Sequence, residues 1–378
     1  LLRKWDCNVP TLRFKQYHCP WSTYHLSDIA EVVGGGTPDT TVSSLWNGDI
    51  QWFTPTEVGH QKYVSKSART ITQLGLQKSS AKKLPAGSIL LSSRATIGEC
   101  SIAQRECTTN QGFQNLIPKK DTNNEFLYYL AQTKKHHFIK YASGSTFLEI
   151  SNSEIKKTKC TVPGTEEQTQ IAAFLSALDD RIAVQNKIIS KYETLIKGLC
   201  DMIFPSIEGS ILPLKAIVSI EKGQQINGMS LAKTGKYYYL NGGIAPSGYI
   251  DDYNTSEETI SISEGGNSCG FVSYNLQKFW SGGHCYTLKI MAEQCRSKYL
   301  FFYLKYKEKD IMQLRVGSGL PNIQKKSLEN FNVKLPNYKK QCFVERVFEV
   351  VTAKKEIENA LLERFQSQKK FLLSKMFI

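Results

Sequence analysis

The chain has 378 residues, of which 48 are Lys or Arg and 34 are Asp or Glu, so its formal net charge at pH 7 is +14. This length predicts two or three domains, and a hydrophobic fraction of 41% is too high for a disordered chain. The basic excess favours an anionic partner, which could be nucleic acid, an acidic protein or an anionic membrane surface.

Several classes of protein are excluded at this point. No run approaches 18 apolar residues, which excludes a transmembrane helix, and the first residues lack the apolar core of a signal peptide. The sequence begins with Leu1 rather than Met, so we expect a few native residues to precede it. The ten cysteines form no Cys-x-x-Cys pair, and we expect reduced thiols in a cytoplasmic protein rather than a zinc site.

The charge is distributed unevenly along the chain. Residues 1–163 carry a net charge of +8, residues 206–331 carry +3 and residues 332–378 carry +5. Residues 164–205 carry −2 and are poor in glycine. One long segment therefore differs from both of its neighbours.

Residues 1–160 predict a mixed α/β domain. The segment 88–94 is rich in β-branched and aliphatic residues and is typical of a strand, whereas the glycines at 34–36, followed by Thr37 and Pro38, predict a turn.

Residues 161–206 predict a coiled-coil helix. Apolar side chains recur at alternating steps of four and three residues, with Gln185 in the one gap, which gives a period of 3.5. An ordinary amphipathic helix is the alternative. The expected seam residues are Ile171, Leu175, Leu178, Ile182, Ile189, Tyr192, Ile196, Leu199 and Ile203.

Residues 207–333 predict a second mixed α/β domain, and residues 334–378 predict a second long helix. The second helix repeats the first at an offset of 173 residues, which also relates Pro163 to Pro336 and Gln168 to Gln341. Its expected seam residues are Val344, Phe348, Val351, Leu362, Phe365 and Leu372.

Three charged residues of the second helix, Lys355, Glu358 and Lys369, fall where seam residues are expected. This irregularity favours pairing with the first helix over self-association. The predicted fold class is therefore α/β (α+β), with two domains separated by two helices that pair as an antiparallel coiled coil.

A search for catalytic motifs returns no match. The segment 228–237 has six residues between its glycines, where a phosphate-binding loop has four, and there is no Gly-x-Ser-x-Gly. None of the six histidines has metal-binding spacing on a helix. We therefore expect a protein that binds and positions something while another chain performs the reaction.

The order of the motifs resembles the specificity subunit of a type I restriction–modification system. The segments that carry the resemblance are 26–39, 45–52, 84–98, 109–113 and 144–150 in the first domain, 241–249 and 263–266 in the second, and the two duplicated helices. The resemblance implies two target-recognition domains, each of which reads one half of a split DNA target. A continuous helix over 166–203 would be ~57 Å long and could hold these domains apart.

The resemblance also implies the partners. A specificity subunit binds double-stranded DNA and joins two modification subunits, which methylate adenine with S-adenosylmethionine, and two motor-nuclease subunits, which use ATP and Mg²⁺. No cofactor, no metal and no membrane is expected for this chain itself.

Candidate DNA contacts are polar or basic residues on or beside glycine-rich turns, because Lys and Arg bind phosphate while Arg, Asn, Gln and Ser read bases. In the first domain we predict Thr37, Lys62, Arg94, Asn110, Gln111 and Ser145. In the second we predict Lys236, Asn241, Tyr249, Asn267, His284 and Ser318. Ser145 and Ser318 recur at the same offset and are equally consistent with scaffold turns.

Three other functions stay open on sequence alone. The chain could be a stand-alone two-headed DNA-binding or regulatory protein of the same fold, an enzyme such as a nuclease with an unrecognised site, or a coiled-coil scaffold whose basic domains bind acidic protein.

Overall fold

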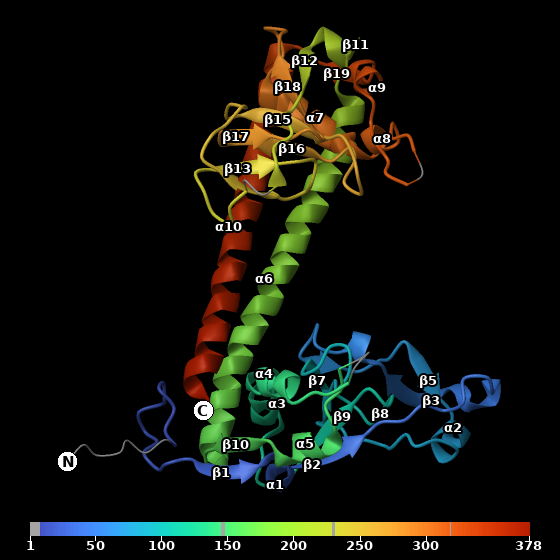
Figure 1. Cartoon of the computed structure of the whole chain (residues 1–378), viewed down its shortest axis with the longest axis vertical. Helices are drawn as coiled ribbons and strands as arrows, with labels where there is room; N and C mark the ends of the chain where they lie inside the picture. Colours follow the sequence, from blue (N-terminus) through green and yellow to red (C-terminus); the bar gives the residue numbers. More distant parts are fainter. Residues whose placement is uncertain (1–7, 145–147, 229–230, 318) are drawn as a thin grey trace. The chain divides into compact units, whose positions relative to one another are not determined.

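The computed structural model describes residues 8–144, 148–228, 231–317 and 319–378, and Figure 1 labels its elements. The chain forms two compact units. The first consists of residues 1–186 and 360–378, and the second of residues 187–359. Each unit contains one mixed α/β head together with part of each long helix. The first head precedes residue 165, and the second head spans residues 207–337.

Within its described residues, the first head contains three sheets, with strand orders β2-β9-β6-β7-β4, β5-β3-β8 and β1-β10. The strands are β1 (Ser22–His25), β2 (Ala30–Gly34), β3 (Trp46–Phe53), β4 (Tyr63–Val64), β5 (Arg69–Ile71), β6 (Ile89–Leu91), β7 (Cys100–Ala103), β8 (Thr108–Thr109), β9 (Gln114–Pro118) and β10 (Lys159–Val162). The helices are α1 (Leu26–Ile29), α2 (Gln73–Gln77), α3 (Asn124–Thr133), α4 (Lys135–Lys140) and α5 (Asn152–Lys157).

Local sequence explains the packing of this head. All three residues of β6, which lies between β9 and β7, are buried, so both faces of the sheet are covered at this strand. Helix α3 begins at an Asn123 cap whose side chain accepts from the Phe126 N–H at 3.0 Å. It buries Phe126, Leu127 and Leu130, which share one helix face, and packs against β6 and β7.

The described part of the second head also contains three sheets, with strand orders β12-β18-β15-β16, β14-β13-β17 and β11-β19. The strands are β11 (Ser210–Pro213), β12 (Val218–Lys222), β13 (Tyr237–Leu240), β14 (Gly248–Ile250), β15 (Thr259–Ser263), β16 (Val272–Asn275), β17 (Phe279–Ser281), β18 (Cys285–Ile290) and β19 (Asn332–Leu335). The helices are α7 (Ser297–Tyr306), α8 (Glu308–Met312) and α9 (Lys325–Glu329).

The two heads share one topology, although their sequences show little of it. Strands β2, β9, β6 and β7 correspond in order to β12, β18, β15 and β16, and the first head adds β4 at the edge. In the three-stranded sheet of each head, the central strand, β3 or β13, has one antiparallel and one parallel neighbour. The duplication therefore includes the heads as well as the helices.

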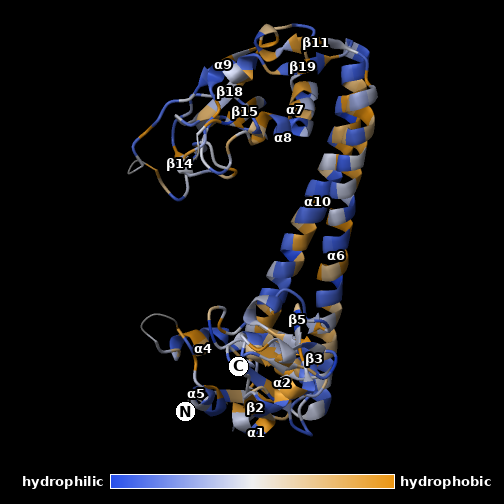
Figure 2. Cartoon of the chain, turned by 90° about the vertical axis from the view of Figure 1, so that its right-hand side faces the viewer, coloured by the Kyte–Doolittle hydropathy of each residue, from blue (hydrophilic) through white to orange (hydrophobic). Residues whose placement is uncertain are grey.

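The long helices are α6 (Thr165–Ser206) and α10 (Tyr338–Met376), and Figure 2 shows apolar and polar residues alternating along both. All fifteen expected seam residues are buried or half-buried. Leu175, Val344 and Phe348 are at most 1% exposed.

Ion pairs link α6 and α10 within each unit. In the first unit the Lys369 ammonium lies 2.6 Å from the Asp179 carboxylate, and in the second Lys355 lies 2.9 Å from Glu193. The two acids on α6 are fourteen residues, or two heptads, apart, and so are the two lysines on α10. The acid later in α6 pairs with the lysine earlier in α10, so the two helices run in opposite directions. The lysines at expected seam positions are thus matched by acids on α6, which confirms the predicted antiparallel pairing of the helices.

Aromatic side chains at the ends of the long helices enter the cores of the heads. Phe204 of α6 stacks on Phe348 in the second unit, with ring centroids 5.5 Å apart. Phe377, just after α10, stacks on Phe126 at 5.2 Å and contacts Trp21 edge-on in the first unit. These two phenylalanines are related by the 173-residue offset.

A buried glutamine joins the first head to the first turn of α6. The Gln168 amide donates to the carbonyls of Pro163 at 2.9 Å and Asp121 at 3.3 Å. Its side-chain oxygen accepts from the Asn123 N–H at 3.0 Å. The side chain thereby fixes the end of β10 and the start of α3 to the helix.

The second head repeats this connection. The Gln341 amide donates to the carbonyls of Pro336 and Gln294, both at 2.8 Å, and its oxygen accepts from the Arg296 N–H at 2.9 Å. Gln168 and Gln341 are 4% and 0% exposed. Their shared sequence position therefore reflects a shared structural role.

We predict that Gln168→Ala and Gln341→Ala each lower the free energy of unfolding by about 1–3 kcal/mol, because each leaves buried backbone groups without a partner. Gln366→Ala, on an exposed position of α10, is the matched control and should change little. Thermal unfolding of the full chain measures both, and equal effects from all three variants would contradict the role of the buried pair.

We also predict that Lys369→Glu lowers the melting temperature, because it places two acids together where both side chains are at most 20% exposed. The expected decrease in the free energy of unfolding is about 1–3 kcal/mol. The exchanged pair Asp179→Lys with Lys369→Glu should recover part of it. A double variant no more stable than the sum of its two changes would show that the pair does not interact.

Candidate nucleic-acid interface

The glycine-rich turn of the first head lies against the loop that follows β8. The Gly36 N–H donates to the Thr109 carbonyl at 2.8 Å, and the Asn110 N–H donates to the Phe53 carbonyl at 3.0 Å. The Thr37 hydroxyl donates to the side-chain oxygen of Gln111. The structure thus brings together three of the predicted contacts, Thr37, Asn110 and Gln111.

This close approach requires glycine. A Cβ at Gly35 would overlap the carbonyl oxygen of Asn110, and one at Gly36 would overlap the backbone of Ala81. At Gly34, in contrast, an added Cβ would meet only the Gln114 side chain at 3.7 Å, an ordinary contact. The Gly35–Gly36 pair therefore allows two loops distant in sequence to meet.

The second head builds the same framework from different residues. The Gln224 N–H donates to the Ser281 carbonyl and the Gly282 N–H donates to the Leu240 carbonyl, both at 2.8 Å. A Cβ at Gly223 would overlap the carbonyl oxygens of Ser281 and Gly282. Gly223 therefore occupies the place of Gly35.

In each head, the indole N–H of a tryptophan hydrogen-bonds to a backbone carbonyl of the turn. Trp52 Nε1 donates to the Gly36 carbonyl at 2.9 Å, and Trp280 Nε1 donates to the Gln224 carbonyl at 2.8 Å. Trp52 lies on β3 whereas Trp280 lies on β17, so the same hydrogen bond is made from different strands. The backbone framework is common to the heads, and the side chains around it differ.

Two predicted residues of the second head join this framework. The His284 N–H donates to the side-chain oxygen of Asn241 at 3.1 Å, directly beside the tight turn at Gly242. Asn267 is exposed on the neighbouring loop. Lys236 lies next to β13, with its ammonium 5.2 Å from the Tyr237 ring centroid.

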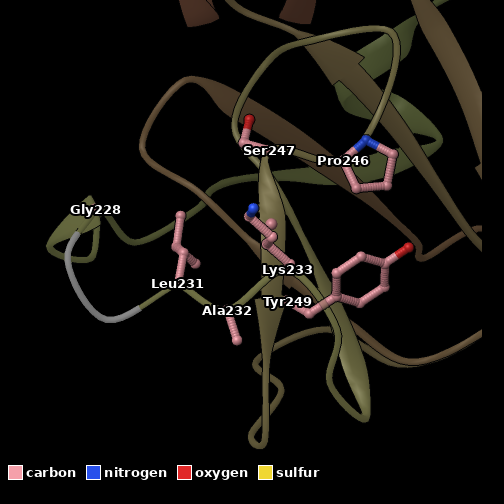
Figure 3. A pocket seen from close by; sticks show the side chains of 8 residues that line it. Gly228, Leu231, Ala232, Lys233, Pro246, Ser247 and Tyr249 are labelled. Atoms are coloured by element: carbon pink, nitrogen blue, oxygen red, sulfur yellow. The ribbon is translucent and has the colours of Figure 1, made fainter.

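Tyr249 lines a shallow pocket of about 450 Å³ in the second head. Figure 3 shows Leu231, Lys233, Pro246 and Tyr249 around it. Strand β14 and the segment at Ala232 are joined by a pair of 3.0 Å backbone hydrogen bonds between Ala232 and Tyr249. The pocket contributes a lysine and an aromatic ring to one surface, a combination suited to nucleic acid.

Lys62 is placed in an ion pair rather than on an open surface. Its side chain is 10% exposed, and its ammonium lies 3.1 Å from Glu125 and hydrogen-bonds to the Ser176 hydroxyl. Burial opposes ionisation of Glu125, but hydrogen bonds from Ser176, Tyr63 and Lys62 outweigh it and hold the pKa of this carboxyl below its ordinary value. These contacts favour a structural role for Lys62, in joining the head to α6.

Arg94 lies with Nε 2.8 Å from Glu149, and its side chain is 43% exposed. It can therefore reach DNA only by sharing its guanidinium with that carboxylate. Ser145 and Ser318 lie outside the described residues.

Sequence reasoning missed a stacked guanidinium in the first head. The Arg69 guanidinium carbon lies 3.6 Å from the Trp46 ring centroid, and Trp46 Nε1 donates to the Asp39 carbonyl at 2.9 Å beside the Thr37 turn. Because Arg69 and Trp46 meet only through the pairing of β5 with β3, no local motif signals the contact.

The described residues provide neither a metal site nor a membrane span. Within them, no group of three His, Cys, Asp or Glu side chains could hold a metal ion. No helix among them is long and apolar enough to cross a membrane.

Comparison with known proteins identifies the family of the chain. The family model described as "Type I restriction modification DNA specificity domain" matches residues 19–194 and again residues 211–366. The chain belongs to this family. The two specificity domains each include one head and most of the following long helix, which agrees with the duplication read from the sequence.

The chain is also similar to proteins described as specificity subunits of type I restriction enzymes. The chain is 38% identical over 195 residues to the "Type I restriction enzyme MjaIX specificity subunit" of Methanocaldococcus jannaschii, a match that covers 50% of this chain and 45% of that protein. This match therefore spans less than half of that relative. The putative MjaX specificity subunit of the same organism is 24% identical over 403 residues, covering 94% and 92%.

A solved structure has the same fold. The S subunit of a type I restriction–modification system from M. genitalium matches with a TM-score of 0.69 at 19% identity, over 98% of this chain and 99% of that one. The predicted class of two mixed α/β domains with two long helices is thereby confirmed.

We predict that Gly35→Ala weakens binding to a DNA target by about tenfold or more, because the added Cβ displaces the loop that carries Asn110 and Gln111. Gly34→Ala is the matched control and should retain affinity. Fluorescence anisotropy with a labelled duplex measures binding, and thermal unfolding identifies a misfolded head. Equal binding by both variants would place the turn away from DNA.

Proposed function

We propose that this chain is the DNA-reading specificity subunit of a type I restriction–modification complex, in which each head reads one half of a split target. One observation supports this most strongly. The two heads share a hydrogen-bonded framework in which Gly35 corresponds to Gly223. Side chains at other matching places differ, because Gln225 stands in the second head where Thr37 stands in the first. A common framework with exchanged side chains suits two readers of different sequences.

We place the chemistry of the complex on other chains. Two modification subunits would methylate adenine with S-adenosylmethionine, and two motor-nuclease subunits would translocate and cleave DNA with ATP and Mg²⁺. In this assignment the present chain is not itself catalytic and acts in the cytoplasm, where it positions those subunits on DNA.

An apolar stripe on α10 supports docking of a modification subunit. Phe343, Val350 and Ile357 follow one another at seven-residue spacing, and they are 61%, 53% and 66% exposed. Such a stripe is a second seam, suited to a partner helix with apolar residues at the same spacing.

The long helices would set the gap between the two half-targets. At ~1.5 Å per residue, each added heptad lengthens a helix by ~10 Å, which corresponds to roughly three base pairs of B-DNA. Insertion in α6 alone would break its pairing with α10, so a matched insertion is needed in both helices.

We predict that one heptad inserted into both α6 and α10 changes the length of the non-specific spacer and leaves both half-targets unchanged. Methylome sequencing of cells that express the complex gives both. As a control, exchange of exposed polar residues for alanine along one heptad of α10, with Phe343, Val350 and Ile357 kept, retains the length and should keep the spacer. An unchanged spacer in the double-insertion variant would refute the role of the helices.

A further inference from the structure

A buried carboxylate lies beneath the candidate interface of the second head. Glu264, just after β15, is 8% exposed as a residue. Its Oε1 lies 2.6 Å from the Lys222 ammonium and accepts from the Tyr286 hydroxyl at 3.1 Å. Among the described residues, no donor hydrogen-bonds to its buried Oε2, and His284 Nδ1 lies 3.5 Å from that oxygen.

The groups around this carboxylate differ in exposure. Lys222 and His284 have side chains 51% and 64% exposed, whereas that of Glu264 is 11% exposed. A buried charge is costly unless it is paired, so Glu264 restricts where the Lys222 ammonium can lie. An ammonium has three donors, and the hydrogen bond to Glu264 uses one of them.

The arrangement belongs to the second head alone. Glu264 N–H donates to the His284 carbonyl at 2.9 Å, and in the first head Ser93 N–H donates to the Gly112 carbonyl at 2.8 Å. Ser93 and Gly112 therefore occupy the places of Glu264 and His284, and neither has an ionisable side chain. A charged group present in only one of two equivalent frameworks suits sequence reading better than shared scaffolding.

The location is also that of the interface. His284 contacts Asn241 beside the Gly242 turn, and Gly223, which immediately follows Lys222, makes the close approach to Gly282. The Lys222 ammonium is thus held at the turn that corresponds to Gly35 in the first head.

We infer that Lys222, positioned by Glu264, is a specificity-determining residue that contacts a guanine in the half-target read by the second head; this rests on the proposed function. Guanine presents two acceptors, N7 and O6, on its major-groove edge, whereas adenine presents one acceptor and one donor. A lysine has donors and no acceptor, so it favours guanine. Glu264 is a positioning residue, because its carboxylate is nearly buried.

The test begins with the wild-type chain in complex with its modification subunits. Methylome sequencing gives the two half-targets, and duplexes are then made in which each G·C pair is replaced in turn by A·T. The binding of each complex to these duplexes is then compared. The Lys222→Met complex should lose about tenfold or more of its preference for G·C at one position of one half-target, and the Glu264→Gln complex should lose part of that preference.

Lys289→Met is the matched control, because Lys289 is exposed at the far end of β18 and its loss changes the charge equally. Retained discrimination at the other half-target shows that each variant is folded. Lys222→Met that weakens binding to all duplexes alike would make Lys222 a phosphate contact and overturn the inference, as would unchanged discrimination or a change at an A·T pair. A wild-type complex without a bipartite target would instead refute the proposed function.

Discussion

In each head, the side chain of a buried glutamine ties the backbone of the head to the first turn of a long helix. Gln168 and Gln341 each satisfy two carbonyls and one N–H that would otherwise be buried without partners. Since breaking any of these bonds leaves a polar group unsatisfied, the first helical turn and the head behave as one body. The attachment therefore fixes the orientation of the first helical turn relative to the head of the same unit.

Within each unit the helices add a second constraint. Acidic residues on α6 meet lysines on α10, and a shift of either helix by one heptad would leave at least one charge of the set without its partner. The apolar seam alone would tolerate such a shift more readily, because one apolar contact resembles the next. The ion pairs therefore select one register among several of similar apolar burial.

The helices could be predicted from the sequence, whereas much of the interface could not. A period of 3.5 residues is local information, and it reports burial directly, as at Leu175 and Phe348. Thr37 and Gln111 were each predicted as candidate contacts because they lie beside glycine-rich turns, but their hydrogen bond to one another was not predicted. The pairing of Lys62 with Glu125 and the stacking of Arg69 on Trp46 depend on strand pairing between distant segments, which leaves no local pattern. The common topology of the heads is carried by backbone hydrogen bonds, so it persists where the side chains have diverged.

The position of Phe377 has a consequence for how the chain is made. The first core includes Trp21 and Phe126, but it is completed by a ring that lies about 250 residues further along the sequence than Phe126. During synthesis, part of the apolar interior of the first head stays open until Phe377 has left the ribosome. The second core has no such delay, because Phe204 has already emerged when its partner Phe348 is made. The head that is translated first is thus the last to finish folding.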